Sequence, residues 1–151
     1  MKFYKGLLLF ILINFSALAI GTWLMNDGPR TEWYINLNQA PWSPPGWVFG
    51  VAWSSIMILF SVYMTFLIQV NRSKKVILLF SAQFVLNVIW NYLFFNQHLI
   101  NLGLLNIILL TVLMFYFLIA FKDSLKNKRF YVLPYCIWLV LATSLNLYIA
   151  L

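Results

Sequence analysis

Five long apolar runs, separated by short polar segments, make up nearly all of this 151-residue chain. They cover roughly residues 6–25, 45–69, 76–95, 102–121 and 131–151. A helix needs about 20 mostly apolar residues to cross the hydrocarbon layer of a bilayer, and each run is about that long. The pattern therefore predicts an all-α membrane protein with one domain, residues 1–151, built as a bundle of five transmembrane helices.

The first run also has features of a cleavable signal peptide, because Lys2 and Lys5 precede it and it contains Ala17 and Ala19. Its apolar character continues past the possible cleavage site, through residues 20–25, which favours a retained helix. The overall composition agrees with a membrane protein. With 64% hydrophobic and 9% charged residues, the chain has too little polar surface for a soluble globule.

The basic residues predict the orientation of the bundle. Nine of the ten lie before the first helix or in the segments that join the second to the third helix and the fourth to the fifth, and only Arg30 lies elsewhere. By the positive-inside rule, the N-terminus is cytoplasmic, and the C-terminus and the segment between helices one and two are outside. We expect a bacterial inner membrane as the location. The net charge of +7 is spread through short loops, so we expect membrane lipids and no nucleic acid as partners.

Residues 33–53 contain four of the seven tryptophans and three of the five prolines. Prolines stiffen the backbone, and tryptophans favour membrane interfaces and pockets. We therefore expect a structured, rigid aromatic lid between the first two helices. Ser43, followed by Pro44 and Pro45, is typical of a helix N-cap with proline in the first turn, so the second helix is predicted to begin there.

Three of the predicted helices carry a polar or small stripe at spacings of three and four residues, which places each stripe on one helical face. Amides in hydrocarbon either bond to neighbouring helices or line a cavity, and both interpretations stay open here. The helix over 102–121 is almost wholly apolar, so we expect it to be the most lipid-exposed wall. The stripes consist of Gly50, Trp53, Ser54, Met57 and Ser61; Gln83, Asn87, Trp90, Asn91 and Phe94; and Tyr135, Trp138, Ala142 and Asn146.

No ionisable Asp, Glu, Lys, Arg or His falls within a predicted span. This disfavours ion-coupled transport, hydrolytic triads and clustered metal ligands. Cys136 is the single cysteine, and we expect it to be a packing residue; His98 is expected to be a solvated loop residue. We therefore expect no metal site and no required cofactor. A neutral cavity walled by Trp53, Trp90 and Trp138 suits a flat, apolar ligand.

Three blocks of residues, in this order, resemble the TspO/MBR family of tryptophan-rich sensory and translocator proteins. The resemblance covers nearly the whole chain. The blocks are Trp33-Tyr34, Leu37, Pro41-Trp42, Pro44-Pro45, Trp47-Val48, Gly50 and Trp53; Gln83, Leu86-Asn87, Trp90 and Phe94-Phe95; and Pro134-Tyr135, Trp138-Leu139, Ala142-Thr143 and Leu145-Asn146.

The resemblance implies a homodimeric five-helix receptor or sensor that binds porphyrins and other flat lipophilic ligands and regulates tetrapyrrole or stress responses. Two alternatives stay open: light- and oxygen-dependent breakdown of protoporphyrin IX, with Trp53 and Trp138 as the catalytic pair, and transport of porphyrins. The chain departs from the cholesterol-recognition pattern of mitochondrial members, because no basic residue follows Tyr148. The expected ligand-binding residues are Tyr34, Trp42, Trp53, Asn87, Trp90, Trp138 and Ala142.

Overall fold

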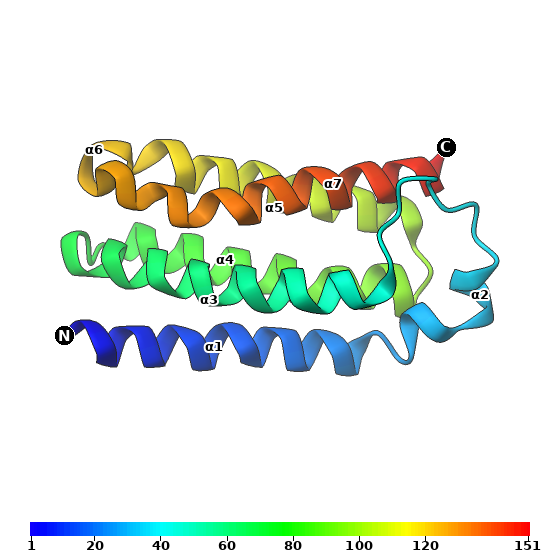
Figure 1. Ribbon diagram of the computed structural model, residues 1–151, viewed down its shortest axis with the longest axis horizontal. Coiled ribbons are helices and arrows are strands. Elements are labelled where there is room, and N and C mark those ends of the chain that lie inside the picture. Colours follow the sequence, from blue (N-terminus) through cyan, green and yellow to red (C-terminus); the bar gives the residue numbers. More distant parts are fainter.

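The computed structural model describes residues 1–151 as five long helices lying side by side (Figure 1). All five are long and apolar enough to cross a membrane, so the predicted five-helix membrane bundle is confirmed. The long helices are α1 (Phe3–Leu24), α3 (Gly46–Val70), α4 (Lys74–Asn91), α5 (Ile100–Ala120) and α7 (Leu133–Ala150). The short elements are η1 (Gly28–Arg30), α2 (Glu32–Ile35), η2 (Tyr92–Asn96), α6 (Lys122–Leu125) and η3 (Lys126–Val132).

The predicted N-cap of the second long helix, Ser43, is wrong by two residues. Helix α3 begins at Gly46, with Pro45 in the N-cap position and no side-chain cap. The Ser43 hydroxyl instead donates a hydrogen bond to the Ala40 carbonyl oxygen at 2.7 Å, within a turn. A residue that precedes proline is biased against the helical conformation, so Pro44 cannot start a helix while Pro45 follows it.

Helix α4 ends in a π-helical turn, η2, which sequence periodicity did not predict. The two neighbouring side chains Phe94 and Phe95 are both buried there. Turns of this kind are often found at functional sites. Here the turn directs two consecutive aromatic rings into the bundle beneath α2.

The bundle is most tightly packed in the half that contains the chain's N-terminus and α6. Phe60, Tyr63, Leu67 and Phe117 are fully buried there. The Tyr63 hydroxyl donates to the Phe117 carbonyl oxygen at 2.6 Å, which links α3 to α5. Aromatic contacts continue this core from α3 to α4, since Phe60 stacks on Phe80 with a centroid separation of 6.0 Å.

The prediction that residues 102–121 form the most lipid-exposed wall is also wrong. In the most apolar 18-residue stretch of each helix, 33% of the residues of α5 are buried, against 22% of those of α1 and of α4. Helix α5 packs between α4 and α7 because small and polar residues face its neighbours. Asn106 Nδ2 donates to the Leu86 carbonyl oxygen at 2.8 Å, and Gly103 lies against Phe94 and Asn146.

Basic residues gather at one end of the bundle. Nine of the ten lie in three parts of the chain: the N-terminus, the α3–α4 connection and the α6 region. Figure 1 shows these three parts together at one end of the bundle, opposite α2 and the C-terminus. This end therefore has nine basic residues, while Arg30 alone lies at the other end. The residues are Lys2, Lys5, Arg72, Lys74, Lys75, Lys122, Lys126, Lys128 and Arg129.

Candidate ligand-binding cavity

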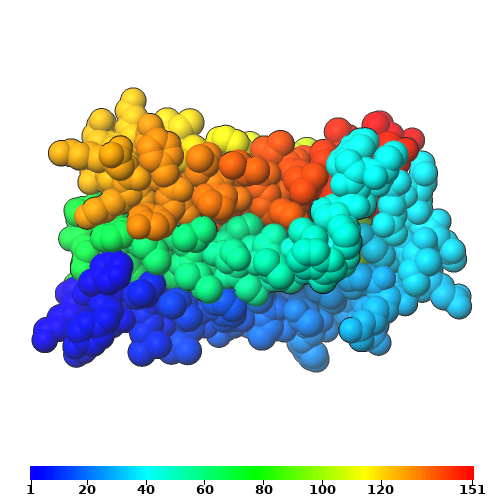
Figure 2. Space-filling view, viewed as in Figure 1, coloured from blue at the N-terminus to red at the C-terminus, as the bar shows by residue number.

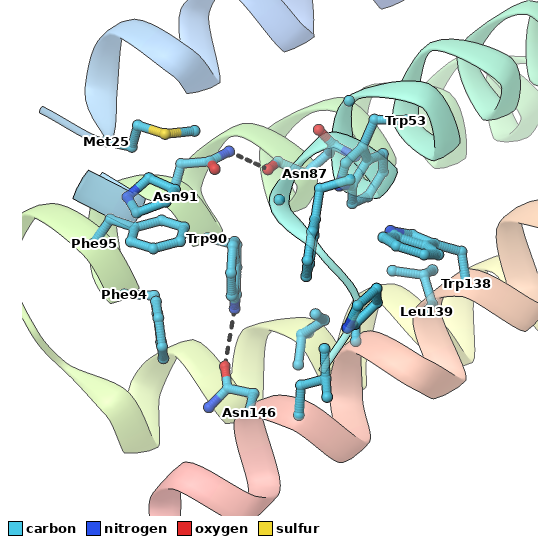
Figure 3. A pocket seen from close by; sticks show the side chains of 18 of the residues that line it. Met25, Trp53, Asn87, Trp90, Asn91, Phe94, Phe95, Trp138, Leu139 and Asn146 are labelled. Carbon is cyan, nitrogen blue, oxygen red and sulfur yellow. Dashed lines mark hydrogen bonds between the residues drawn. The ribbon is translucent and has the colours of Figure 1, made fainter. Parts of the chain in front are cut away.

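A cavity of about 590 Å³ lies between the helices at the α2 end of the bundle (Figure 3). Residues from α1, α3, α4, η2, α5 and α7 form its walls, and residues from η1, α2 and the following loop also line it. The cavity is therefore enclosed by transmembrane helices and by the segment that the sequence predicts as a lid.

The lid is attached to the bundle by aromatic contacts. Trp33 stacks on His98 with a centroid separation of 3.9 Å and an interplanar angle of 9°. Tyr34 packs against Phe95 at 5.2 Å and lines the cavity. The short helix α2 is capped by Thr31, whose Oγ1 accepts a hydrogen bond from the Tyr34 amide at 3.3 Å. His98 remains exposed, as expected, and it supports the lid through this stack.

Trp42 does not line the cavity, although the sequence places it among the expected ligand-binding residues. Its indole Nε1 donates to Ser144 Oγ of α7 at 3.0 Å, and its ring packs edge-on against Tyr148 at 5.3 Å. Figure 2 shows the segment around residue 40, in cyan, lying over the red end of α7. Trp42 therefore fastens the loop to α7 from outside the cavity.

Two indoles from opposite helices form one wall. Trp53 of α3 and Trp138 of α7 lie 6.5 Å apart between ring centroids, at 81° to each other. Phe49 extends this wall by packing edge-on against Trp138 at 5.4 Å. The Trp138 Nε1 atom is buried and has no hydrogen-bond partner. These contacts fix the two rings in an edge-to-face arrangement, which is a favoured geometry for aromatic pairs.

A third indole, Trp90 of α4, forms the wall nearer the lid. It stacks on Phe94 at 5.0 Å and 10°. Its Nε1 donates to Asn146 Oδ1 of α7 at 3.0 Å, the lower dashed line in Figure 3. Asn146 Nδ2 in turn donates to the Ile100 carbonyl oxygen at 3.3 Å. The hydrogen bonds therefore hold this ring in place across the interface between α4 and α7.

The amides of α4 have both of the roles that the sequence leaves open. Asn87 lines the cavity, and its Nδ2 also donates to the Tyr135 hydroxyl of α7 at 2.7 Å. That hydroxyl donates to Gln83 Oε1 at 2.8 Å, so Gln83 bonds across helices and does not line the cavity. Asn91 lines the cavity and donates to the Asn87 carbonyl oxygen within its own helix at 3.3 Å.

The cavity has no charged wall. None of its 26 lining residues is Asp, Glu, Lys, Arg or His. Burial raises the pKa of the Tyr34 hydroxyl above its usual value, so this phenol stays neutral across the physiological range. No three His, Cys, Asp or Glu side chains gather where they could hold a metal ion. Recognition in this cavity must therefore rest on shape, stacking and neutral hydrogen bonds.

Six of the seven expected ligand-binding residues line the cavity, and Trp42 is the exception. Ala142, also in the wall, leaves space opposite the larger side chains. Other lining residues were not predicted. Thr22 and Met25 continue the helical face of Leu18, a spacing that could have indicated them; Phe49 and Gln39 carry no such signal.

These features define an integral membrane protein whose helices enclose a neutral aromatic cavity under a loop lid. The TspO/MBR family profile matches residues 9–151, and the chain belongs to this family. It is 32% identical over 117 residues to the tryptophan-rich sensory protein of Cereibacter sphaeroides, covering 76% of this chain and 73% of that protein. Protein CrtK of Rhodobacter capsulatus is 32% identical over 120 residues, covering 76% and 74% of the two chains. The human translocator protein is 24% identical over 124 residues, covering 79% and 73%.

Proposed function

We propose that this protein is a membrane receptor or sensor that binds porphyrins and similar flat, lipophilic molecules in the cavity. The observation that carries this proposal is the neutral space of about 590 Å³ walled by Trp53, Trp90 and Trp138. Each aromatic contact between a ligand ring and an indole contributes roughly 0.5–1.5 kcal/mol beyond simple area burial. A relative named as a tryptophan-rich sensory protein supports a sensing role.

The polar groups in the walls can orient such a ligand. Asn87 and Asn91 lie on one helix, and Gln39 lies in the lid, where its Nε2 donates to the Tyr34 carbonyl oxygen at 2.9 Å. Because the lid is part of the wall, a bound ligand touches the lid directly. Occupancy of the cavity would therefore change the outer surface of the protein, which is what a sensor requires.

Titration with protoporphyrin IX in detergent micelles tests this proposal. We expect saturable quenching of tryptophan fluorescence with one site per chain. Replacing Trp138 with Leu should weaken binding about tenfold, the factor that a loss of about 1.4 kcal/mol produces. Trp23→Leu is the matched control, because Trp23 is 79% exposed and lies outside the cavity. Quenching that does not saturate, or an equal effect of both variants, would contradict the proposal.

A second candidate function, light-dependent oxidation of porphyrin, is favoured by the pairing of Trp53 and Trp138 at 6.5 Å. A photoexcited porphyrin can take an electron from an adjacent indole and pass it to dioxygen, which becomes superoxide. The indole radical cation then regains its electron from the porphyrin, and superoxide adds to the resulting porphyrin radical cation, so that both atoms of dioxygen enter the macrocycle. The double variant Trp53→Phe/Trp138→Phe should then abolish light-dependent loss of protoporphyrin absorbance while dark binding persists. Unchanged photobleaching by the binding-competent variant would exclude this activity.

The orientation in the membrane is part of the proposal. The end with nine basic residues is assigned to the cytoplasm of a bacterial inner membrane, which places the lid and the cavity mouth outside. A Glu32→Cys variant should react with a membrane-impermeant maleimide in spheroplasts, in which the outer membrane is removed and the inner membrane stays intact. Cys136 is fully buried and gives little background. Labelling only in inverted vesicles would reverse the assignment.

The homodimer that the family resemblance implies stays a prediction.

A further inference from the structure

A chain of three hydrogen-bonding side chains runs from the buried core to the cavity. Asn87 Nδ2 donates to the Tyr135 hydroxyl at 2.7 Å, and this hydroxyl donates to Gln83 Oε1 at 2.8 Å. Gln83 and Tyr135 are each 1% exposed, while Asn87 lines the cavity. Only one member of the chain can therefore meet a ligand, and the other two act through it.

The direction of this chain decides which polar group the ligand meets. Asn87 Oδ1 has no partner in the protein and is not among the three side-chain polar atoms that are sealed without one. It is therefore accessible, and it faces the cavity that Asn87 lines. In this arrangement the wall presents a carbonyl oxygen, which accepts a hydrogen bond from a ligand N–H.

The opposite direction fits the same geometry. Gln83 Nε2 is sealed inside the protein without an acceptor. A half-turn of both amides would let Gln83 Nε2 donate to the Tyr135 hydroxyl, and the hydroxyl would then donate to Asn87 Oδ1. The buried Gln83 donor gains a partner in exchange for the one that its carbonyl loses, which brings the two arrangements close in energy.

The tyrosine ring itself is held still. It packs edge-on against Trp53 at 5.8 Å and against Phe60 at 5.4 Å. The oxygen of Tyr135 therefore stays between the two amides, and only its hydrogen needs to change direction. From a single oxygen atom, a hydroxyl can accept from either amide while donating to the other.

We propose that Tyr135 is a specificity-determining residue that lets Asn87 present either a carbonyl or an amino group to the ligand. Ligands with an N–H on the ring edge select the first direction, and ligands with a carbonyl select the second. One neutral cavity thereby accepts aromatic molecules of both kinds. The inference rests on the proposed ligand-binding function, and it assigns the recognition of ring-edge polarity to the Gln83–Tyr135–Asn87 relay.

Three flat tricyclic probes of nearly equal shape test the relay: carbazole, with an N–H donor; fluorenone, with a carbonyl acceptor; and fluorene, with neither. In Gln83→Met, the Tyr135 hydrogen has Asn87 Oδ1 as its remaining acceptor in the relay, so Asn87 turns its amino group to the cavity. We expect carbazole binding, measured by titration calorimetry in micelles, to weaken roughly fivefold to tenfold, the effect of one lost hydrogen bond. Fluorenone and fluorene should bind as they do to the wild type.

Two further variants make the test specific. Gln69→Met is the same chemical change at an exposed position of α3, and it should leave all three affinities unchanged. In a Tyr135→Phe background, Gln83→Met should no longer alter the ratio of carbazole to fluorenone affinity, because the relay is already broken. Unchanged fluorene binding shows that the cavity of each variant is intact.

The proposal would be overturned if Gln83→Met left the ratio of carbazole to fluorenone affinity unchanged. It would also be overturned if Gln83→Met changed this ratio equally in the Tyr135→Phe background. If the wild type binds protoporphyrin IX but none of the three probes, the relay is wrong and the proposed function stands. If protoporphyrin IX also fails to bind, both the relay and the proposed ligand-binding function are wrong.

Discussion

The two halves of helix α3 show how one bundle can be both tightly packed and hollow. In the half nearer α6, the inward side chains Phe60 and Leu67 are fully buried. In the half nearer the lid, Gly46, Gly50 and Trp53 line the cavity, and a Cβ added at either glycine would meet no atom within 4 Å. At one end, large side chains of this helix therefore fill the space between the helices. At the other end, its two glycines leave part of that space empty.

This difference indicates that the cavity stays open because contacts elsewhere in the bundle hold its helices apart. Open space inside a protein forfeits dispersion contacts, so the helices around it gain from collapsing inward. The packed half resists that collapse by fixing the helix positions, and the lid contacts fix the other end. If this view is correct, changes in the packed half should cost stability, and changes around the cavity should cost binding.

The largest effect is expected in the packed half. Phe60→Ala removes a ring that contacts Tyr63, Phe80, Phe117 and Tyr135, and truncations of this kind cost about 3–5 kcal/mol. Thermal unfolding in detergent should show a correspondingly lower midpoint. Phe115→Ala, on an exposed face of α5, should change it far less. Equal losses would mean that the packed half does not dominate stability.

Filling the cavity should cost binding and leave the fold intact. Ala142→Trp places a large ring in the cavity wall, and we expect protoporphyrin IX affinity to fall about 100-fold, or about 2.7 kcal/mol. Val140→Trp, on the exposed side of the same helix, is the control, with 52% of Val140 exposed. Retained affinity in Ala142→Trp, measured by fluorescence titration, would place the ligand elsewhere.

The lid should be sensitive to its contact with the bundle. A Cβ at Gly28 would lie 2.7 Å from Phe95 Cγ, so Gly28→Ala has to displace the ring or η1. Overpacking of this kind costs roughly 1–3 kcal/mol. Gly46→Ala, with open space around its Cβ, should be tolerated. Hydrogen exchange of the lid amides would detect the loosening, and equal protection in both variants would contradict the predicted contact.

The smallest effect is expected at the outer fastening of the loop. Trp42→Phe keeps the ring against Tyr148 but removes the hydrogen bond to Ser144, which is worth about 0.5–1.5 kcal/mol. The ligand should dissociate a few times faster, with little change in the unfolding midpoint. Stopped-flow dissociation measurements check this, and a rate equal to that of the wild type would show that Trp42 does not hold the lid closed.

The fold and most of the cavity wall could be predicted from the sequence because both follow from periodic patterns. The lengths of the apolar runs predict five spans, and the stripe of Gln83, Asn87 and Asn91 predicts an inward face of α4. Trp53 and Trp138 lie on comparable stripes. A spacing of three or four residues shows which side chains share a face, and in a membrane the polar face has strong reason to turn inward.

The remaining features depend on which helices are neighbours, and a pattern within one helix does not contain that information. The exposure of α5 was overestimated because Gly103 and Asn106 could not be matched to α4 and α7. Trp42 was expected to contact the ligand as part of the lid, yet its position depends on a partner in α7, Ser144, that is 102 residues away in the chain. The helix start at Gly46 depends on the successive prolines before it.

The central claim is that flat aromatic ligands occupy the cavity beneath the lid. A crystal or cryo-electron microscopy structure with protoporphyrin IX bound tests it most directly. We predict macrocycle density in the cavity, in contact with Trp53 and Trp138 and covered by the loop that Trp42 fastens to α7. Macrocycle density only on the lipid-facing surface of the helices, with the cavity empty, would contradict the claim.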